Sequence, residues 1–254
     1  MMLIWGLALC SAFEFNLPGG NSAVLAGTAV PLAANAAFLN PALLSNLPSS
    51  SIQLSNAGLY DLFEVQYNRV GFGLRPLAFG GSLSLLGFGG YQELTGTLAK
   101  SFSLPARFCA GIQGNLYALR VPSLADQLVP ALTGGIAWQA SGFGFGGAVQ
   151  NLNAPALRTG DPIPVRLLFG AGVMPAQEML LAADAEYSEC AWRFKFGAGF
   201  EVHRALFMSA GLATNPLQYA VGSTCRYRGL NVSYVYHFSP RLKHIQVLGL
   251  GFSF

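Results

Sequence analysis

The sequence predicts an all-β fold, namely a transmembrane antiparallel β-barrel of about 14 strands with an N-terminal plug segment in the lumen. Hydrophobic residues make up 52% of the chain and charged residues 10%, whereas a typical soluble domain is about 25% charged. Apolar residues alternate with glycine or polar residues along most of the chain, a period typical of strands. No uninterrupted apolar run reaches the roughly 20 residues of a membrane-spanning helix, so a closed barrel is the remaining membrane fold.

The first twelve residues, "MMLIWGLALCSA", resemble the apolar core and the cleavage site of a signal peptide, although the usual basic start is missing. We expect residues 1–12 to be removed by cleavage near Ala12, so that the mature chain begins at Phe13. Cys10 could alternatively be a lipoprotein cysteine, but Leu9 stands where a small residue is expected.

Residues 13–49 are predicted to form the plug. This segment is rich in alanine, is interrupted by glycine and proline, and lacks strand alternation. A barrel of about 14 strands needs such a plug, because side chains alone fill a barrel of only about eight strands. We expect helical turns at Ala36–Leu39 and Pro41–Leu44, capped by Asn35 or Asn40.

Residues 50–254 are predicted to form the barrel. In "WRFKFGAGFE", Trp192, Phe194 and Phe196 share one face, whereas Arg193 and Lys195 share the other. The stretches "NVSYVYHF", "FCAGIQGNLYA" and "LTGGIAWQA" repeat this pattern. Lipid outside and a polar or packed lumen inside is its simplest cause. Strand centres are expected near residues 54, 67, 82, 97, 113, 135, 147, 168, 182, 197, 209, 221, 234 and 249.

The predicted connections alternate in length along the chain. Tight ones are "RP" at 75–76, "LPAR" at 104–107, "SG" at 141–142, "MPAQ" at 174–177 and "HR" at 203–204. Longer ones are "RVPSLADQLVP" and "NLNAPALRTGDPIP". Short periplasmic turns and longer outer loops are typical of outer-membrane barrels. We therefore expect an even strand count with both ends of the barrel in the periplasm.

Five charged residues are predicted to face the lumen as a charge ladder. A loop at 188–191 would set Glu186 opposite Arg193. The same register would set Asp184 opposite Lys195. Such a ladder could select solutes, but we favour a brace for the barrel and plug, because an unpaired desolvated charge costs several kcal/mol. The ladder comprises Arg166, Asp184, Glu186, Arg193 and Lys195.

Nothing in the sequence predicts an enzyme, a metal site or a cofactor. The cysteines beyond the signal region are far apart, the three histidines are not at ligand spacing, and "GFGFGG" is itself an alternating strand. The net charge of +3 comes without a run of Lys or Arg, so nucleic acid is not an expected partner. These cysteines and histidines are Cys109, Cys190, Cys225, His203, His237 and His244.

Three stretches resemble the PorV/PorQ family of outer-membrane barrels, within the wider group of FadL-like transporters. The stretch "FEFNLPGGNSAVLAGTAVPLAANAAFLNPALL" resembles the family's mature N-terminus. "VQNLNAP" resembles a strand end of the family, and "YVYHFSPRLKHIQVLGLGFSF" resembles its last hairpin. The matching plug motif comprises Gly19, Gly27, Asn40, Pro41 and Ala42. The alternating Leu250, Phe252 and Phe254 resemble the terminal signal that the barrel-assembly machinery reads.

The resemblance implies a non-enzymatic protein of the bacterial outer membrane, associated with protein export by type IX secretion or with surface attachment through partner binding. Its expected partners are outer-membrane lipid, the barrel-assembly machinery and secretion-system proteins. The alternative is a FadL-like channel for passive uptake of small hydrophobic molecules. We rank this alternative second, because the sequence shows no unusually apolar lumen.

Overall fold

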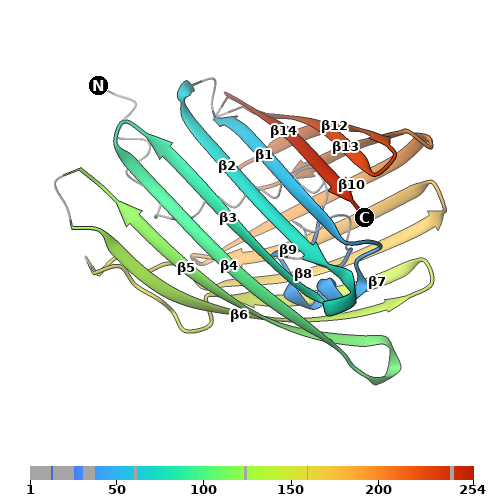
Figure 1. Cartoon of the computed structure of the whole chain (residues 1–254), viewed down its shortest axis with the longest axis horizontal. Coiled ribbons are helices and arrows are strands. Elements are labelled where there is room, and N and C mark those ends of the chain that lie inside the picture. The colour runs from blue at the N-terminus through green and yellow to red at the C-terminus, as the bar shows by residue number, and fades with distance from the viewer. Residues whose placement is uncertain are drawn as a thin grey trace.

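Fourteen antiparallel strands close into a barrel in the computed structural model of the chain (Figure 1). The structure describes residue 13 and residues 26–30, 38–59, 62–122, 125–158, 160–240 and 243–254, without the side chains of Phe63 and Lys243. Each strand pairs with its neighbours in sequence, and β1 (Ser51–Leu59) pairs with β14 (Lys243–Ser253) to close the barrel. The predicted fold class and strand number are therefore confirmed.

The other strands follow one another around the barrel in chain order. They are β2 (Leu62–Leu74), β3 (Phe79–Phe88), β4 (Tyr91–Ser103), β5 (Phe108–Arg120), β6 (Gln127–Ala140), β7 (Phe143–Gln150), β8 (Arg166–Ala176), β9 (Met179–Ser188), β10 (Ala191–His203), β11 (Leu206–Ala213), β12 (Gln218–Tyr227) and β13 (Leu230–Ser239).

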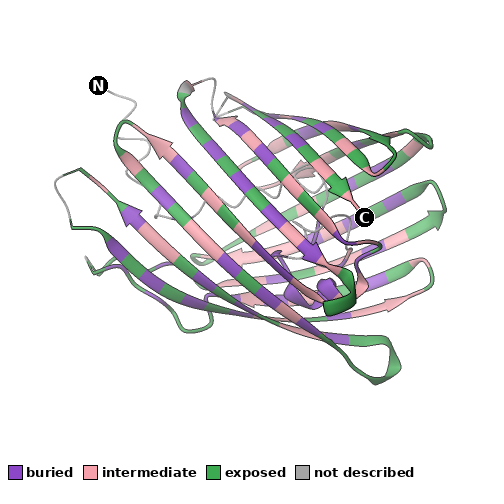
Figure 2. Cartoon of the chain, viewed as in Figure 1, coloured by how far each residue is buried: buried purple, intermediate pink, exposed green. Residues whose placement is uncertain are grey.

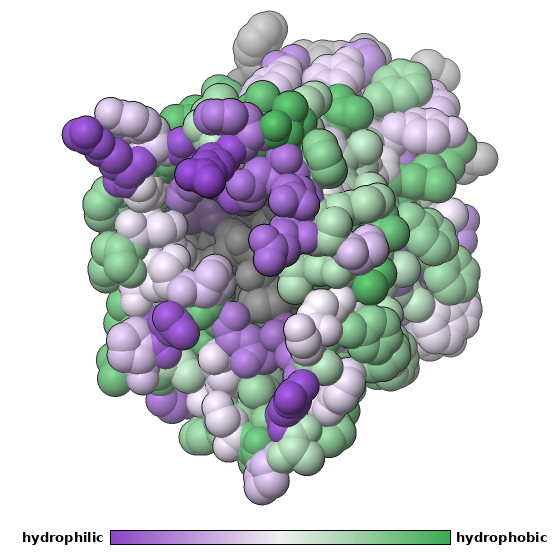
Figure 3. Space-filling view, turned by 90° about the vertical axis from the view of Figure 1, so that its right-hand side faces the viewer, coloured by the Kyte–Doolittle hydropathy of each residue, from purple (hydrophilic) through white to green (hydrophobic). Residues whose placement is uncertain are grey.

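The two ends of the barrel differ in their connections. The short 3-10 helices η4 (Arg75–Leu77) and η5 (Pro105–Arg107) lie at what we call the turn end, where the described connections are all short. The opposite end, the loop end, carries the connections at 121–126 and 151–165. β1 starts and β14 finishes at the turn end, as predicted. Seen from this end, hydrophilic residues surround a hollow (Figure 3).

More buried and more exposed residues alternate along the strands, as the bands of Figure 2 show. On β10, the side chains of Trp192, Phe194 and Phe196 are exposed on the outer face, and those of Arg193 and Lys195 point inward. The predicted faces of this strand are thus confirmed. The exposed apolar band is what a lipid-facing barrel requires.

Aromatic residues gather near both rims of the outer wall, as in the interfacial girdles of membrane barrels. Near the turn end, the Phe143 and Phe145 rings meet edge to face with centroids 4.5 Å apart. Near the loop end, Trp192 stacks on Phe194 at 6.2 Å. Phe254 lies exposed at the turn end, beside Phe252.

The plug contains one described helix, the 3-10 helix η3 (Pro41–Asn46). Asn40 caps it, since its side chain accepts a hydrogen bond from the backbone N–H of Ala42 at 3.1 Å, and proline occupies the first helical position. The predicted turn over Pro41–Leu44 is therefore confirmed. Asn35, most of the turn at Ala36–Leu39 and the motif residue Gly19 lie outside the described residues. No helix in the described part of the chain is long and apolar enough to span a membrane.

Candidate functional site: the plugged lumen

The plug helix packs against the inner wall formed by β4, β5 and β6. Its apolar side chains are fully buried against small wall residues, and the cluster comprises Phe38, Ala42, Leu43, Leu44, Leu47, Ala99, Cys109 and Ala137. A Cβ added to Gly111 of the wall would lie 2.4 Å from the backbone nitrogen of Ala42. The wall at this place is thus shaped for a closely apposed backbone.

Asn40 ties three segments together in the lumen. Its side-chain nitrogen donates to the carbonyl oxygens of Thr28, at 2.8 Å, and Ile136, at 2.9 Å. Its side-chain oxygen caps η3, and the residue is completely buried. A buried amide with these partners is stabilising, whereas an unsatisfied one would cost about 1–3 kcal/mol. Asn40 therefore joins residues 26–30, the plug helix and strand β6.

Asp184 of β9 holds the preceding part of the plug. Its Oδ2 atom accepts hydrogen bonds from the backbone N–H of Gly27 at 2.8 Å, the backbone N–H of Thr28 at 3.1 Å and the hydroxyl of Thr28 at 2.8 Å. Asp184 is also buried. Gly27, Asn40, Pro41 and Ala42 of the predicted motif thus all take part in plug contacts.

A track of inward glycines lets the plug lie directly on the wall. An added Cβ would lie within 2.2 Å of a plug or anchor atom at four of them, which is far inside a normal contact. These four glycines and the nearest atoms are Gly135 with Asn40 Oδ1, Gly146 with the Thr28 carbonyl oxygen, Gly170 with Asp184 Oδ1, and Gly172 with Val30 Cγ2. The sequence pattern showed these glycines only as the small face of strands.

The register of the charge ladder is as predicted, but one ion pair differs. Glu186 lies opposite Arg193, and Asp184 lies opposite Lys195. The Lys195 ammonium instead lies 2.7 Å from Oε2 of Glu186, which is two residues after Asp184 on β9. The salt bridge of Lys195 is thus with Glu186, while Oδ2 of Asp184 accepts hydrogen bonds from the plug and Asp184 still interacts electrostatically with Lys195.

The remaining ladder bases surround Glu186 near the loop end. Glu186 interacts electrostatically with Arg166 and Arg193 as well as with Lys195, and Arg193 also donates to the side-chain oxygen of Gln218 at 2.7 Å. The ladder is therefore a connected group on β8, β9, β10 and β12. Whether it selects solutes or braces the wall stays open, and bracing remains our prediction.

A polar belt crosses the lumen on the opposite wall. Asn115 accepts hydrogen bonds from Thr97 at 3.0 Å and from Gln113 at 2.8 Å, and it donates to Thr133 at 3.3 Å. Beside them the Arg69 guanidinium lies 5.0 Å from the centroid of the Phe38 ring. The cavity enclosed here measures about 40 Å³, little more than one water occupies. The belt is therefore closed to larger solutes in this state.

An apolar inner wall, which we call the loop-end apolar wall, covers β12–β14 and β1–β3 toward the loop end. Its buried members comprise Ala57, Leu59, Val65, Tyr67, Leu86, Ala220, Val235, Ile245 and Val247. These side chains have the inward parity of their strands, opposite to exposed neighbours such as Leu54 and Leu248. The interior of the barrel thus contains a buried apolar cluster here, whereas the sequence showed no sign of an unusually apolar lumen. Each strand contributes only one or two of these residues, so no single stretch of sequence revealed them.

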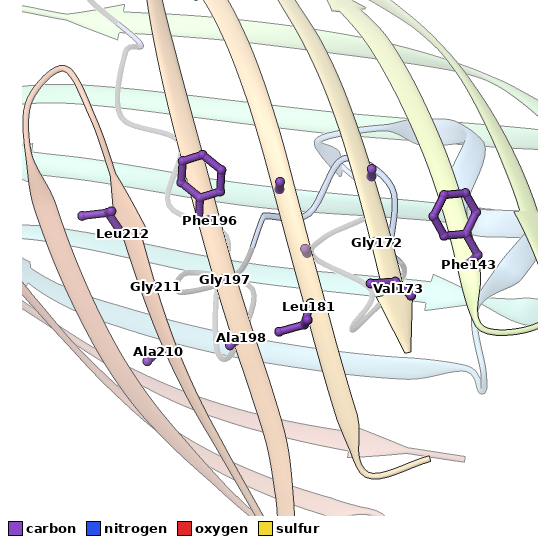
Figure 4. A pocket seen from close by; sticks show the side chains of 13 residues that line it. Phe143, Gly172, Val173, Leu181, Phe196, Gly197, Ala198, Ala210, Gly211 and Leu212 are labelled. Atoms are coloured by element: carbon purple, nitrogen blue, oxygen red, sulfur yellow. The ribbon is translucent and has the colours of Figure 1, made fainter. Parts of the chain in front are cut away.

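The outer wall has an apolar hollow of about 570 Å³ over β7–β11 (Figure 4). Small residues form its floor, and Phe143, Leu181, Phe196 and Leu212 are among the larger side chains around it. Gly172 belongs to the same lining and faces Val30 of the plug on its inner side. Most of the residues that line this hollow are glycine or alanine, so side chains add little bulk to the barrel wall here.

No group of three or more His, Cys, Asp or Glu residues that could hold a metal occurs within the described ranges. Cys109 is buried beneath the plug helix, while Cys190 and Cys225 are exposed and far from it in sequence. The expectation that the protein has no metal, no cofactor and no catalytic site stays a prediction.

Together, the closed antiparallel wall, the apolar exterior and the internal plug define a membrane β-barrel whose structural neighbours are outer-membrane barrels. The toluene transporter TbuX of Ralstonia pickettii is similar, with a TM-score of 0.72 and 11% identity over 96% of this chain and 100% of that chain. The toluene transporter TodX of Pseudomonas putida has a TM-score of 0.67 and 10% identity, covering 95% of this chain and 98% of that chain.

The monoaromatic hydrocarbon channel CymD has a TM-score of 0.61 and 12% identity, covering 95% of this chain and 99% of that chain. At these identities the likeness shows a shared fold alone, that of a closed β-barrel. No protein-family model and no curated protein sequence matches the chain.

Proposed function

We propose that the protein is a non-enzymatic channel of the bacterial outer membrane for passive passage of small hydrophobic molecules, and that the plug is its gate. The loop-end apolar wall is the observation that carries this proposal. Porin lumens are polar and filled with water, whereas sites for apolar ligands are lined mostly by hydrophobic side chains. An apolar wall inside a membrane barrel therefore favours an apolar solute.

The comparisons support the same class of solute. TbuX and TodX are toluene transporters, and CymD is a monoaromatic hydrocarbon channel. Because the identities are 10–12%, these names alone do not carry a substrate over to this chain. The side chains of the loop-end apolar wall, mostly aliphatic with Tyr67 among them, argue independently for a small apolar solute.

The order of zones along the lumen explains why a gate is needed. From the loop end inward, the lumen contains the loop-end apolar wall, whose side chains are buried, then the polar belt with its cavity of about 40 Å³, and then the plug helix. The belt and the plug block further movement. Passage therefore requires displacement of the plug, whose described anchors include Asn40 and Asp184.

The test measures the uptake of radiolabelled toluene by cells that carry the protein in their outer membrane. The lipopolysaccharide leaflet of this membrane slows apolar solutes, so the uptake rate reports passage through the protein. Val235→Asp places a carboxylate in the loop-end apolar wall, where Val235 is fully buried, and should lower uptake at least about tenfold, because burying a charge is strongly unfavourable. Ser233→Asp is the matched control, since Ser233 also faces inward on β13.

Val235→Thr replaces one methyl group by a hydroxyl of similar size. It therefore tests the polarity of the wall in a barrel that should still assemble. Heat-modifiable mobility on gels would show that each variant forms a closed barrel. Equal toluene uptake by the parent and both Val235 variants would contradict the proposal.

The export function rests on the sequence resemblance to the PorV/PorQ family, and the similar structures named above are transporters and channels. This function remains the second candidate, supported by the plug motif and the last hairpin. Deletion of the gene followed by analysis of surface-attached proteins would test it. Loss of those proteins with unchanged toluene uptake would favour export over the channel.

A further inference from the structure

Phe13 lies buried in the mouth of the barrel at the loop end. Its ring centroid is 4.7 Å from that of Tyr117. The surrounding apolar cluster comes from the loop ends of β5 and β6 and from the connection at 151–165, and it comprises Leu119, Val129, Leu157 and Ile163. The plug therefore has an anchored residue at the opposite end of the lumen from η3.

The backbone nitrogen of Phe13 is bound by a carboxylate. It donates to Oε2 of Glu93 at 3.0 Å, and the other carboxylate oxygen accepts from the hydroxyl of Tyr91. Glu93 faces inward on β4 and is buried. A carboxylate binds an ammonium through a shorter and stronger hydrogen bond than it makes to an amide. The environment of this nitrogen is thus suited to a positive charge.

The backbone conformation of Phe13 also supports a mature chain that begins at this residue. Its φ angle is +66°, in the left-handed region that bulky side chains rarely adopt. The angle φ is defined by the carbonyl carbon of the preceding residue, so the crowding disappears if the chain begins at Phe13. The residues just before it, Cys10, Ser11 and Ala12, place small side chains where a signal peptidase requires them.

We propose that the Ala12–Phe13 bond is the processing site and that Glu93 is the receptor for the new N-terminal ammonium of Phe13. Water adds to the carbonyl carbon of Ala12 and the C–N bond breaks. The Ala12 carboxylate leaves with the signal peptide, and the Phe13 nitrogen is protonated, because an α-amine has a pKa of about 7.7–8.0. The catalyst is a signal peptidase of the exporting cell, and no redox change occurs.

The ion pair has a structural role that does not depend on the identity of the transported solute. Chain termini are usually poorly ordered unless they are tied down. Here Glu93 holds the first residue of the plug at the loop end, Asp184 holds Gly27 and Thr28, and Asn40 holds the start of η3. The plug is thereby fixed at three levels of the lumen.

The test uses the full-length protein exported in a Gram-negative host and purified from its outer membrane. Mass spectrometry should find Phe13 at the N-terminus. An amine-acetylating reagent should modify the Phe13 α-amine at least about tenfold more slowly in the folded barrel than after denaturation, because the amine is buried in an ion pair. Glu93→Gln should remove most of this protection, whereas Glu64→Gln, at an exposed carboxylate, should leave it intact.

Three results would overturn the proposal. The first is an N-terminus other than Phe13. The second is equal acetylation of Phe13 in the folded and denatured parent, a comparison that needs no variant. The third is full protection in an assembled Glu93→Gln barrel. If Glu93→Gln does not assemble, Glu93→Asp keeps the charge on a shorter side chain and should show partial protection, and full protection there would also count against the pairing.

Discussion

At the scale of single residues, Asp184 shows how one side chain of the wall can hold a plug. One of its carboxylate oxygens accepts three hydrogen bonds from Gly27 and Thr28. Strand alternation predicted that Asp184 faces the lumen and lies opposite Lys195. Its hydrogen-bond partners are more than 150 residues away in sequence, and no periodic pattern in the sequence relates them to Asp184. The register was therefore predictable, and the partner was not.

Replacing Asp184 by alanine should loosen the plug without opening the strand ladder. The change leaves two backbone N–H groups and one hydroxyl without their acceptor, and each such loss costs about 1–3 kcal/mol. We expect single-channel recordings in planar bilayers to show more frequent ion-conducting openings than the parent barrel.

Asp126→Ala is the matched control for this change. Asp126 is exposed in the connection at 121–126, and its ion pair with Arg120 is on the surface, so its loss should leave the recordings unchanged. Parent-like recordings for an assembled Asp184→Ala barrel would show that this carboxylate does not anchor the plug.

At the scale of elements, the plug helix and the wall strands are fitted to one another. The capping asparagine and the proline after it were readable from local sequence, and η3 forms where they predicted it. The surface that receives the plug was not readable from the sequence, because the glycines that lie closest to the plug and its anchor Asp184 are spread over β5, β6, β7 and β8. Only closure of the barrel brings them to one face.

Gly135→Ala tests this fit with a single methyl group. The new Cβ would lie 2.2 Å from the side-chain oxygen of Asn40, so the plug must shift and its hydrogen bonds must weaken. We expect raised ion conductance and a lower melting temperature, since overpacking typically costs about 1–3 kcal/mol.

Gly114→Ala provides the control, because no atom lies within 4 Å of the added Cβ at that position. Both variants make the same chemical change in a strand, so propensity effects cancel. If the two variants conduct ions equally, the close approach of the plug to Gly135 has no role in closing the lumen.

At the scale of the whole molecule, composition and alternation predicted the barrel, its strand number and its two ends. These features follow from the solvent, because a lipid-facing wall must be apolar outside and must pair every strand edge. The lumen was harder to predict. Its loop-end apolar wall is built from one or two inward residues on each of six strands, and within any one strand these residues look like ordinary packing residues.

This distribution supports one of the two functions that the sequence left open. A lumen lined only by polar and charged groups would give an apolar solute no favourable surface, and the resemblance to export-associated barrels would then stand alone. The loop-end apolar wall instead favours the channel, and bracing remains our prediction for the charge ladder on the far side of the lumen.

The central claim is tested most directly by comparing two solutes in the same cells. Cells that produce the parent protein in their outer membrane are supplied with radiolabelled toluene or with radiolabelled glycerol, a small polar solute, and initial uptake rates are compared with those of cells lacking the protein. A plugged barrel with an apolar inner wall should raise toluene uptake at least about tenfold and leave glycerol uptake unchanged, because the polar solute gains nothing from an apolar wall. Faster glycerol uptake with unchanged toluene uptake would reveal a water-filled pore and would contradict this account.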